Sequence, residues 1–380
     1  MQTVNFNGLS DADSHNNQVS FNNENMVRSN SELNTYDFRK KTLLEQEYET
    51  YKKKTDRKNV FLICDVSANL KKLSLVKNTF EDSELDEWDK KITGPVYCMC
   101  VSEHHNSIYL SVGNGFMIEC DFESQTIRKN WGKIHSRSIY ALALSNNNNY
   151  IFTGGIDKEL KCWDLKTGEL FHNYGAYQEN SILKMVCTKD DKFIYTAGAD
   201  LRLLKIAFKD DQDDSLDYGI VHRNNINNML LSKCGDFLIT SACHVDIKIW
   251  SIADDFIHHH LFEAHNKPVT SLALCGNNLI SGSEDGNVKM WDIKTGNLIK
   301  ELDQFYEFDS AYNEKLNSRS FKKAKNAALS IKFMCVSKDH KYLLAINDNN
   351  KVIQWDIELN VLFRELGSFF DNYIIGVNAI

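Results

Sequence analysis

A tryptophan-centred segment recurs along the chain at a nearly constant interval, and this repeat constrains the fold more than any other feature. Ile206 follows Trp163 by 43 residues, Trp250 follows Ile206 by 44, and Trp291 follows Trp250 by 41. Around Trp163 and Trp291 the sequence almost repeats, because each is followed by Asp, one apolar residue and then Lys-Thr-Gly. A period of this length indicates a chain built from stacked units of supersecondary structure.

Each unit begins with an apolar strand that ends in Ser or Thr. In five of six units, the Trp position lies 24 residues after the first residue of that strand. These first strands are expected at Val96–Ser102, Ile139–Ser145, Ile182–Thr188, Ile226–Ser232 and Ile331–Ser337, with a sixth beginning at Val269. A second strand precedes a tight turn, a third holds the Trp position, and a fourth follows a Lys-Thr-Gly type turn. Four strands in a repeat of this length predict the blade of a β-propeller.

The two ends of the sequence predict one further unit, shared between them. Val60–Cys64 and Leu70–Leu75 have the pattern of a second and a third strand, but no first strand precedes them. Ile374–Ile380 stands 19 residues after Trp355, where a first strand is expected. We therefore predict an all-β, seven-bladed propeller over residues 58–380, closed by the C-terminal strand. Closure removes the exposed sheet edges that invite aggregation.

The segment before the propeller divides into two parts of different composition. Residues 1–35 are rich in Asn and Ser and predict a disordered tail, because they bury too little apolar surface to offset chain entropy. Residues 36–57 contain helix formers, and Leu44, Tyr48 and Tyr51 share one narrow helical stripe. This pattern favours a charged helical linker. The alternative is a helix that docks on the propeller or on a partner.

Composition excludes several classes of protein. A net charge of −8 argues against an electrostatic nucleic-acid binder as a whole. Ten cysteines without a CxxC pair argue against a zinc module or a disulfide framework, which indicates an intracellular protein, cytoplasmic or alternatively nuclear. The N-terminus has no apolar signal run, and no segment of about 18 apolar residues exists to span a membrane.

Two units carry the same set of four side chains, namely His135, Thr153, Asp157 and Trp163, and His265, Ser281, Asp285 and Trp291. A buried Asp in a tight turn needs donors, and an imidazole N–H and a hydroxyl provide them. With these sets, residues 58–380 resemble the WD40-repeat family, in which the four residues form a hydrogen-bonded structural tetrad. Other units depart from the pattern: Gln178 and Ile206 replace His and Trp in the third, and His244 replaces Asp in the fourth.

The resemblance implies a rigid, non-catalytic platform whose top face holds partners. Carried onto this sequence, the partner-binding positions are Tyr97, Ser138, Tyr140, Leu183, Asn225, Asn227, Thr270, Glu284, Lys332 and Asp348. Tyr97 and Tyr140 come from adjacent units, and tyrosine is a good interface anchor because it joins a rigid apolar body to a polar tip. The alternative is that both rings pack against neighbouring loops.

An insertion at residues 304–328 interrupts the repeat, because the distance from Trp291 to Ile331 exceeds the register by about 21 residues. Its notable side chains are Phe305, Tyr306, Phe321, Lys322, Lys323 and Lys325. Aromatics beside lysines suit contact with a peptide or with RNA. The alternative is an insertion without a binding role.

The sequence thus predicts a scaffold or adaptor that holds other proteins in a multiprotein complex. The alternative is a subunit of an RNA-modifying or RNA-processing complex whose basic insertion contacts RNA. No catalytic motif occurs, so we expect no enzyme activity, cofactor, metal or small-molecule substrate. His258–His260 is expected on an outer edge strand rather than in a metal site, since convergent ligands on other elements are lacking.

Overall fold

The structure is a computed structural model. It describes residues 60–67, 70–74, 79–81, 94–121, 124, 126–208, 215–252, 258–302, 330–358, 360–368 and 374–379. The predicted tail at 1–35, the predicted helical linker at 36–57 and the insertion at 304–328 lie outside these residues. Within the described part of the chain, no helix is long and apolar enough to cross a membrane.

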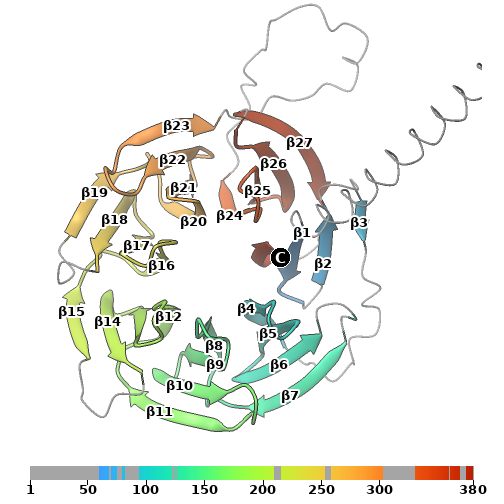
Figure 1. Cartoon of the computed structure of the whole chain (residues 1–380), viewed down its shortest axis with the longest axis vertical. Coiled ribbons are helices and arrows are strands. Elements are labelled where there is room, and N and C mark those ends of the chain that lie inside the picture. The colour runs from blue at the N-terminus through green and yellow to red at the C-terminus, as the bar shows by residue number, and fades with distance from the viewer. Residues whose placement is uncertain are drawn as a thin grey trace, which may run out of the picture. The chain divides into compact units, whose positions relative to one another are not determined.

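The described elements are strands, and they form seven antiparallel sheets of four strands each (Figure 1). Three sheets follow one another along the first half of the chain. The first contains β4 (Val96–Ser102), β5 (Ser107–Val112), β6 (Phe116–Asp121) and β7 (Ile127–Lys133). The second contains β8 (Ile139–Leu144), β9 (Tyr150–Gly155), β10 (Glu159–Asp164) and β11 (Leu170–Ala176). The third contains β12 (Ile182–Cys187), β13 (Phe193–Gly198), β14 (Arg202–Ala207) and β15 (Leu216–Ile220).

Three more sheets follow in the second half. The fourth contains β16 (Ile226–Leu231), β17 (Phe237–Ala242), β18 (Asp246–Ser251) and β19 (His258–Glu263). The fifth contains β20 (Val269–Cys275), β21 (Asn278–Ser283), β22 (Val288–Asp292) and β23 (Leu298–Leu302). The sixth contains β24 (Ile331–Val336), β25 (Tyr342–Asn347), β26 (Lys351–Asp356) and β27 (Val361–Ser368). The all-β prediction is confirmed, and the predicted first strands begin at the residues where β4, β8, β12, β16, β20 and β24 begin.

The seventh sheet joins strands from both ends of the described chain. It contains β28 (Ile374–Ala379), β1 (Val60–Asp65), β2 (Leu70–Ser74) and β3 (Thr79–Glu81) in that order. β28 pairs antiparallel with β1, and Phe61 stands opposite Ala379. The innermost strands touch in sequence, β4 with β8, β8 with β12, and so on to β24 with β28 and β28 with β4. Figure 1 shows the sheets set around a common centre, with β7, β11, β15, β19, β23 and β27 on the outside.

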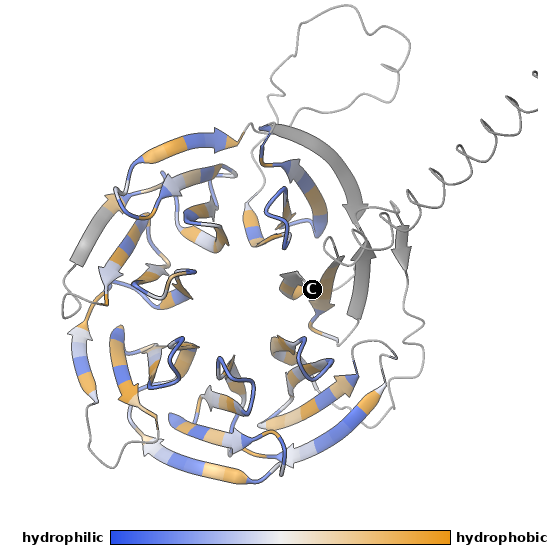
Figure 2. Ribbon diagram, in the orientation of Figure 1, coloured by the Kyte–Doolittle hydropathy of each residue, from blue (hydrophilic) through white to orange (hydrophobic). Residues whose placement is uncertain are grey.

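Seven apolar clusters form the core, and each lies between two neighbouring sheets. One cluster joins Phe152 and Leu160 of the second sheet to Ile182 and Ile194 of the third. The second strand of each sheet is the most deeply buried, as in β9, where every residue after Tyr150 is buried. Outer strands such as β11 are largely exposed, and Figure 2 accordingly shows hydrophilic segments along them. Burial of apolar surface between sheets is the main favourable contribution to this fold.

Small residues at the ends of second strands let the next sheet approach closely. A Cβ added at Gly154 would lie 2.9 Å from the side chain of Ile182 and 2.8 Å from that of Met185. A Cβ at Gly282 would lie 2.8 Å from Ile331 in the same way. Glycine at these positions therefore follows from close packing of one sheet on the next.

In four sheets, the Ser or Thr at the end of the first strand closes the hairpin to the second strand. Ser145 Oγ accepts a hydrogen bond from the backbone N–H of Tyr150 at 3.0 Å. The same bond recurs from Phe193 to Thr188, from Phe237 to Ser232 and from Tyr342 to Ser337. Because a short hydroxyl can replace a backbone acceptor in a turn, these residues fix where the second strand starts.

Candidate partner-binding face and structural tetrads

The second sheet contains a hydrogen-bonded set of four side chains at one end of its strands. Trp163 Nε1–H donates to Thr153 Oγ1 at 3.0 Å, and Thr153 Oγ1 lies 2.7 Å from His135 Nε2. His135 Nδ1 lies 2.9 Å from Asp157 Oδ2. The backbone N–H of Ser136 donates to the same carboxylate oxygen at 2.9 Å. The loop before β8, strand β9, the β9–β10 turn and β10 each contribute one residue.

The fifth sheet repeats the arrangement with a different hydroxyl. Trp291 Nε1–H donates to Ser281 Oγ at 2.8 Å, and Ser281 Oγ lies 2.8 Å from His265 Nε2. His265 Nδ1 lies 3.2 Å from Asp285 Oδ2, which also accepts from the backbone N–H of Asn266 at 3.0 Å. The recurrence in two sheets shows that the spacing of the residues, rather than local chance, produces the geometry.

In the tetrad, the direction of each hydrogen bond follows from which groups carry a proton to donate. The Thr153 hydroxyl accepts from Trp163, and its own proton is then free to point at His135 Nε2. A neutral imidazole protonated on Nδ1 completes the chain by donating to Asp157. Burial, opposed by the charge of Asp285, lowers the pKa of His265, which favours this neutral form in the fifth sheet.

The two carboxylates are held ionised by their donors. Burial acts to raise the pKa of Asp157, but the hydrogen bond and charge of His135 and the backbone N–H of Ser136 outweigh it and lower that pKa. The pKa of Asp285 is lowered by the same balance, in which backbone N–H donors and His265 overcome burial. Each tetrad thus serves as a buried polar network with its groups satisfied.

Comparison with known protein families agrees with this geometry. A family model described as WD domain, G-beta repeat matches residues 130–164 and 256–292, the two segments that hold the tetrads. The chain carries WD40 repeats. No curated relative matches the chain at a significant level.

The third WD40-like unit departs from the tetrad, and its polar atoms are left unpaired. Gln178 replaces His and is 3% exposed, while Ile206 replaces Trp. The hydroxyl of Thr196 and the amide of Gln178 have no hydrogen-bond partner in the described part of the chain. Asp200 still accepts from the backbone N–H of Glu179 at 2.9 Å. The turn is therefore kept although the hydroxyl bridge is lost.

The fourth unit keeps the hydroxyl bridge but lacks the carboxylate. Trp250 Nε1–H donates to Thr240 Oγ1 at 2.9 Å, and Thr240 Oγ1 lies 2.8 Å from His222 Nε2. His244 stands at the Asp position, and its Nδ1 lies 3.0 Å from Asp246 Oδ1. This substitution changes the charge at the end of the sheet, with a consequence developed below.

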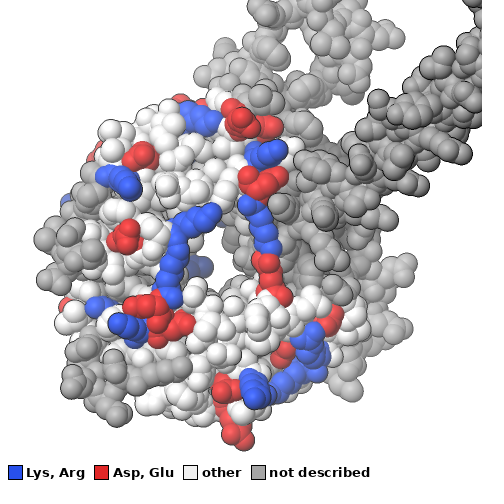
Figure 3. Space-filling view, viewed as in Figure 1, with Lys and Arg blue, Asp and Glu red and all other residues white. Residues whose placement is uncertain are grey.

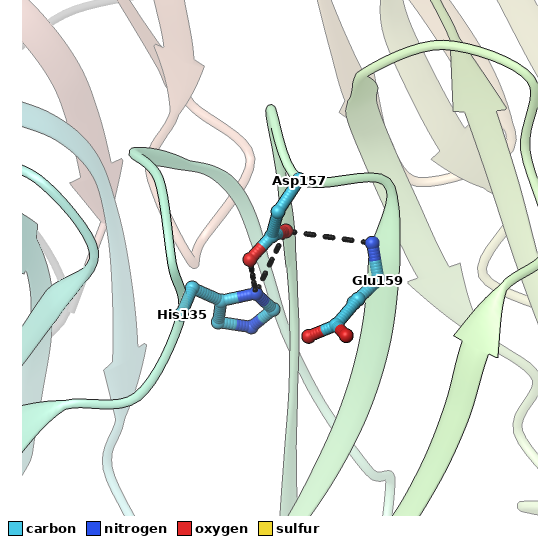
Figure 4. A group of neighbouring side chains, drawn as sticks. All are labelled: His135, Asp157 and Glu159. Carbon is cyan, nitrogen blue, oxygen red and sulfur yellow. Dashed lines mark hydrogen bonds and ion pairs between the residues drawn. The ribbon is translucent and has the colours of Figure 1, made fainter.

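One group near the second tetrad has the composition of a metal site. Ligand atoms of His135, Asp157 and Glu159 lie within 4.8 Å of one another (Figure 4). Both imidazole nitrogens of His135 are already bonded, to Thr153 and to Asp157. The Glu159 carboxylate pairs with Lys161 at 2.7 Å. In the fifth sheet, Asn287 occupies the position of Glu159, so that sheet lacks the third ligand. The group formed by His135, Asp157 and Glu159 is therefore better explained as a tetrad with an ion pair beside it than as a metal site.

Tyr97 and Tyr140 meet at the end of the first and second sheets. Their ring centroids lie 5.2 Å apart with an interplanar angle of 76°, an edge-to-face contact. Both side chains are half-buried, so part of each ring faces solvent. The two rings thus form one continuous aromatic surface contributed by two sheets, which we call the tyrosine pair.

Three other predicted partner-binding positions form hydrogen bonds within the chain or are buried. Asn227 Nδ2 donates to the carbonyl of Val269 at 2.9 Å, and the Thr270 hydroxyl donates to the carbonyl of Ile331. Both bonds link the first strand of one sheet to the first residue of the next. Ser138 is 8% exposed. Asn227 and Thr270 thus use a side-chain donor within the fold, and Ser138 is buried; as partner-binding positions all three stay predictions.

The remaining positions differ in exposure and charge. Lys332 and Asp348 are exposed and form an ion pair at 3.0 Å, while Asn225 is exposed and Leu183 and Glu284 are half-buried. On the face viewed in Figure 3, Lys or Arg side chains lie at the rim of the central opening. All six named insertion residues, from Phe305 to Lys325, lie outside the described residues. β19, which contains His258–His260, is the outer strand of its sheet.

Sequence reasoning missed a lysine that supports the tetrad of the second sheet and the altered set of the fourth sheet. Lys161 Nζ donates to the carbonyl of Ile134, the residue before His135, at 2.9 Å. Lys248 Nζ donates to the carbonyl of Val221, which precedes His222, in the same way. The signal was present in the repeat, because each lysine stands two residues before its Trp.

Proposed function

We propose that this protein is a non-catalytic WD40 scaffold that binds a partner protein across the tyrosine pair. The observation that carries the proposal is the edge-to-face contact of Tyr97 and Tyr140 at 5.2 Å, with both rings half-buried at the junction of two sheets. Tyrosines held rigidly at such a position contribute strongly to binding, because little side-chain entropy remains to be lost. Proteins with WD40 repeats generally bind other proteins, which supports this choice of partner.

We further propose that the seven sheets are the blades of one closed β-propeller. Two apolar clusters support closure through β28. One packs Phe61, Ile63 and Ile374 against Leu344 and Ile346 of the sixth sheet. The other packs Leu62 and Cys64 against the first sheet. A ring closed in this way is rigid, and rigidity suits a platform that holds a partner in fixed orientation.

The absence of catalysis is part of the proposal and rests on the state of the reactive groups. Burial raises the pKa of the Cys98 thiol to about 11 and that of Cys100 to about 12. A nucleophilic cysteine requires the opposite shift. The histidines and aspartates of the tetrads are committed to one another. All ten cysteines are free thiols, which supports a reducing, intracellular location.

Affinity purification with mass spectrometry tests the binding proposal. The double variant Tyr97→Ala, Tyr140→Ala should reduce recovery of specific partners about tenfold or more, since a central aromatic anchor contributes about 2 kcal/mol or more. Phe116→Ala is the matched control, because Phe116 is an exposed aromatic (42%) of the same sheet that lies on β6, whereas Tyr97 lies on β4. A comparison with a chain lacking residues 304–328 separates the face from the insertion. Equal partner recovery by wild type and the double variant would contradict the proposal.

A further inference from the structure

A cavity of about 480 Å³ opens at the end of the fourth sheet, beside the altered tetrad. Its lining includes His222 and Arg223 from the loop before β16, His244 from the β17–β18 turn, and Asp246 and Lys248 from β18. Ile220, 71% exposed, and Phe262 add apolar surface to its wall. We call it the fourth-sheet cavity.

The equivalent place in two other sheets is occupied by a carboxylate. Asp157 and Asp285 each accept the backbone N–H of the residue that follows the tetrad histidine, at 2.9 and 3.0 Å. In the third sheet, Asp200 accepts the corresponding N–H of Glu179 at 2.9 Å. The local backbone of this loop is therefore built to receive a carboxylate oxygen.

The fourth sheet keeps the donors and lacks the acceptor. Arg223 follows His222, and its backbone N–H has no acceptor in the described part of the chain, nor does its guanidinium have an ion pair there. His244, at the Asp position, has its Nδ1 3.0 Å from Asp246 Oδ1, but that nitrogen makes no hydrogen bond in the described part of the chain. In three other sheets the equivalent N–H donates to a carboxylate of the chain itself. The unpaired N–H of Arg223 therefore marks a place where a carboxylate from another molecule can bind.

The charges around the cavity favour an anion at the same place. Burial, and to a lesser degree repulsion from Arg223, lower the pKa of Lys248, against the effect of Asp246. Arg223 and Lys248 both line the cavity, and an anion bound between two cations is stabilised by both. Asp246 lies beside His244 and Glu263 is exposed, and neither carboxylate bonds the Arg223 N–H in the described part of the chain.

We propose that the fourth-sheet cavity binds an Asp or Glu side chain from an acidic segment of a partner protein, seated where Asp157 and Asp285 lie in their own sheets. The backbone N–H and guanidinium of Arg223 receive the carboxylate, and Ile220 and Phe262 contact the apolar part of the segment. The cavity belongs to a different sheet from the tyrosine pair. Its occupancy is therefore measured independently of the function proposed above.

Fluorescence anisotropy with labelled hexaglutamate and the full chain tests the proposal. We expect saturable binding that weakens about fivefold or more in Arg223→Gln, because a charge-assisted contact is lost. His244→Asp should abolish binding, since the new carboxylate occupies the seat from within the chain. Arg137→Gln is the matched control, because Arg137 is exposed in the corresponding loop of the second sheet, where Asp157 fills the place. It should leave the affinity unchanged within about twofold.

Several outcomes would overturn the assignment. Unchanged binding by His244→Asp would show that hexaglutamate sits elsewhere, and equal losses in Arg223→Gln and Arg137→Gln would show nonspecific attraction. Binding of inorganic phosphate without any hexaglutamate binding would replace the carboxylate by a phosphate ligand. Circular dichroism checks the fold of each variant. If His244→Asp does not fold, the comparison of the two arginine variants decides.

Discussion

At the scale of single residues, one buried hydroxyl links a Trp and a His ring in the second, fourth and fifth sheets. Thr240 is an example, because its side chain is fully buried and its Oγ1 lies within hydrogen-bond distance of both Trp250 and His222. Thr196 occupies the corresponding place in the third sheet and is equally buried, but its hydroxyl has no partner in the described part of the chain. The two threonines therefore form a natural pair for comparison.

Replacing the hydroxyl by a methyl group should have opposite consequences at these two positions. Thr240→Val should lower the free energy of unfolding by about 1–3 kcal/mol, because the N–H of Trp250 and the Nε2 of His222 lose their partner. Thr196→Val should leave it unchanged or raise it slightly, since an unpaired buried hydroxyl is removed. Urea denaturation measures both. Equal losses in the two variants would contradict the role of the bridge.

The spacing of residues was sufficient to predict which side chains form the tetrads. It did not predict which contacts the side chains make in the units that depart from the tetrad pattern. His244 was found at the Asp position from the sequence, yet its turn toward Asp246 depends on side-chain directions that spacing does not contain. Asn227 and Thr270 were predicted to face a partner. Their position was taken from a pattern, whereas the carbonyls that they bond belong to the following sheet.

At the scale of elements, the strands follow closely from the apolar pattern and the turn residues. Strand β2 was predicted at Leu70–Leu75 and extends over Leu70–Ser74. The turn after β10 is held by Asp164, whose Oδ1 accepts the backbone N–H groups of Lys166 and Thr167 at 2.8 Å. Gly168 ends it with a φ of 75°, which glycine adopts without strain. Such local chemistry is visible in sequence, so element boundaries could be predicted well.

The pairing of β28 with β1 predicts that a residue distant in sequence from β1 is essential to its sheet. Ile374 is 6% exposed and packs with Phe61 and Ile63. Ile374→Ala should reduce the free energy of unfolding by about 2–4 kcal/mol, because a core cavity is created. Ile299→Ala on the outer strand β23, at a side chain 47% exposed, should change it by no more than about 0.5 kcal/mol. Thermal unfolding of the two variants measures the difference, and a loss at Ile374 no larger than at Ile299 would argue against the pairing.

At the scale of the whole molecule, the stability of the chain should depend on pH through groups spread over several sheets. The pKa values of Asp157 and Asp285 are lower in the folded protein than the ordinary value of 3.8. Their contribution to stability is therefore complete above that value and is lost as the pH falls through the lower folded pKa. Burial also lowers the pKa of His265 below 6.5, so the unfolded chain takes up this proton first and stability declines from about pH 6.5 downward.

Urea midpoints measured between pH 8 and pH 3 should consequently fall on acidification in two stages. Asp157→Asn should show a smaller fall in the more acidic stage, because one of the depressed carboxyls is removed. A midpoint that rises as the pH drops below 6.5 would contradict the sign of these shifts.

The arrangement of the whole molecule was predictable only in part. The register of the repeats indicated four-stranded units, and the structure confirms four-stranded antiparallel sheets. The count of seven blades and their closure stay predictions. The fourth-sheet cavity could not have been foreseen, because it depends on a loop, a turn and three strands whose side chains converge only after folding.

The seventh sheet has a consequence for the order of events during synthesis. More than 300 residues separate Asp65 at the end of β1 from Ile374 at the start of β28. At about 5–20 residues per second, the ribosome needs roughly 15–60 s to make that stretch. Throughout this interval β1 exposes the backbone edge that β28 later covers. The nascent chain therefore offers an unpaired strand to chaperones or to neighbouring nascent chains until β28 has been made and has left the ribosome.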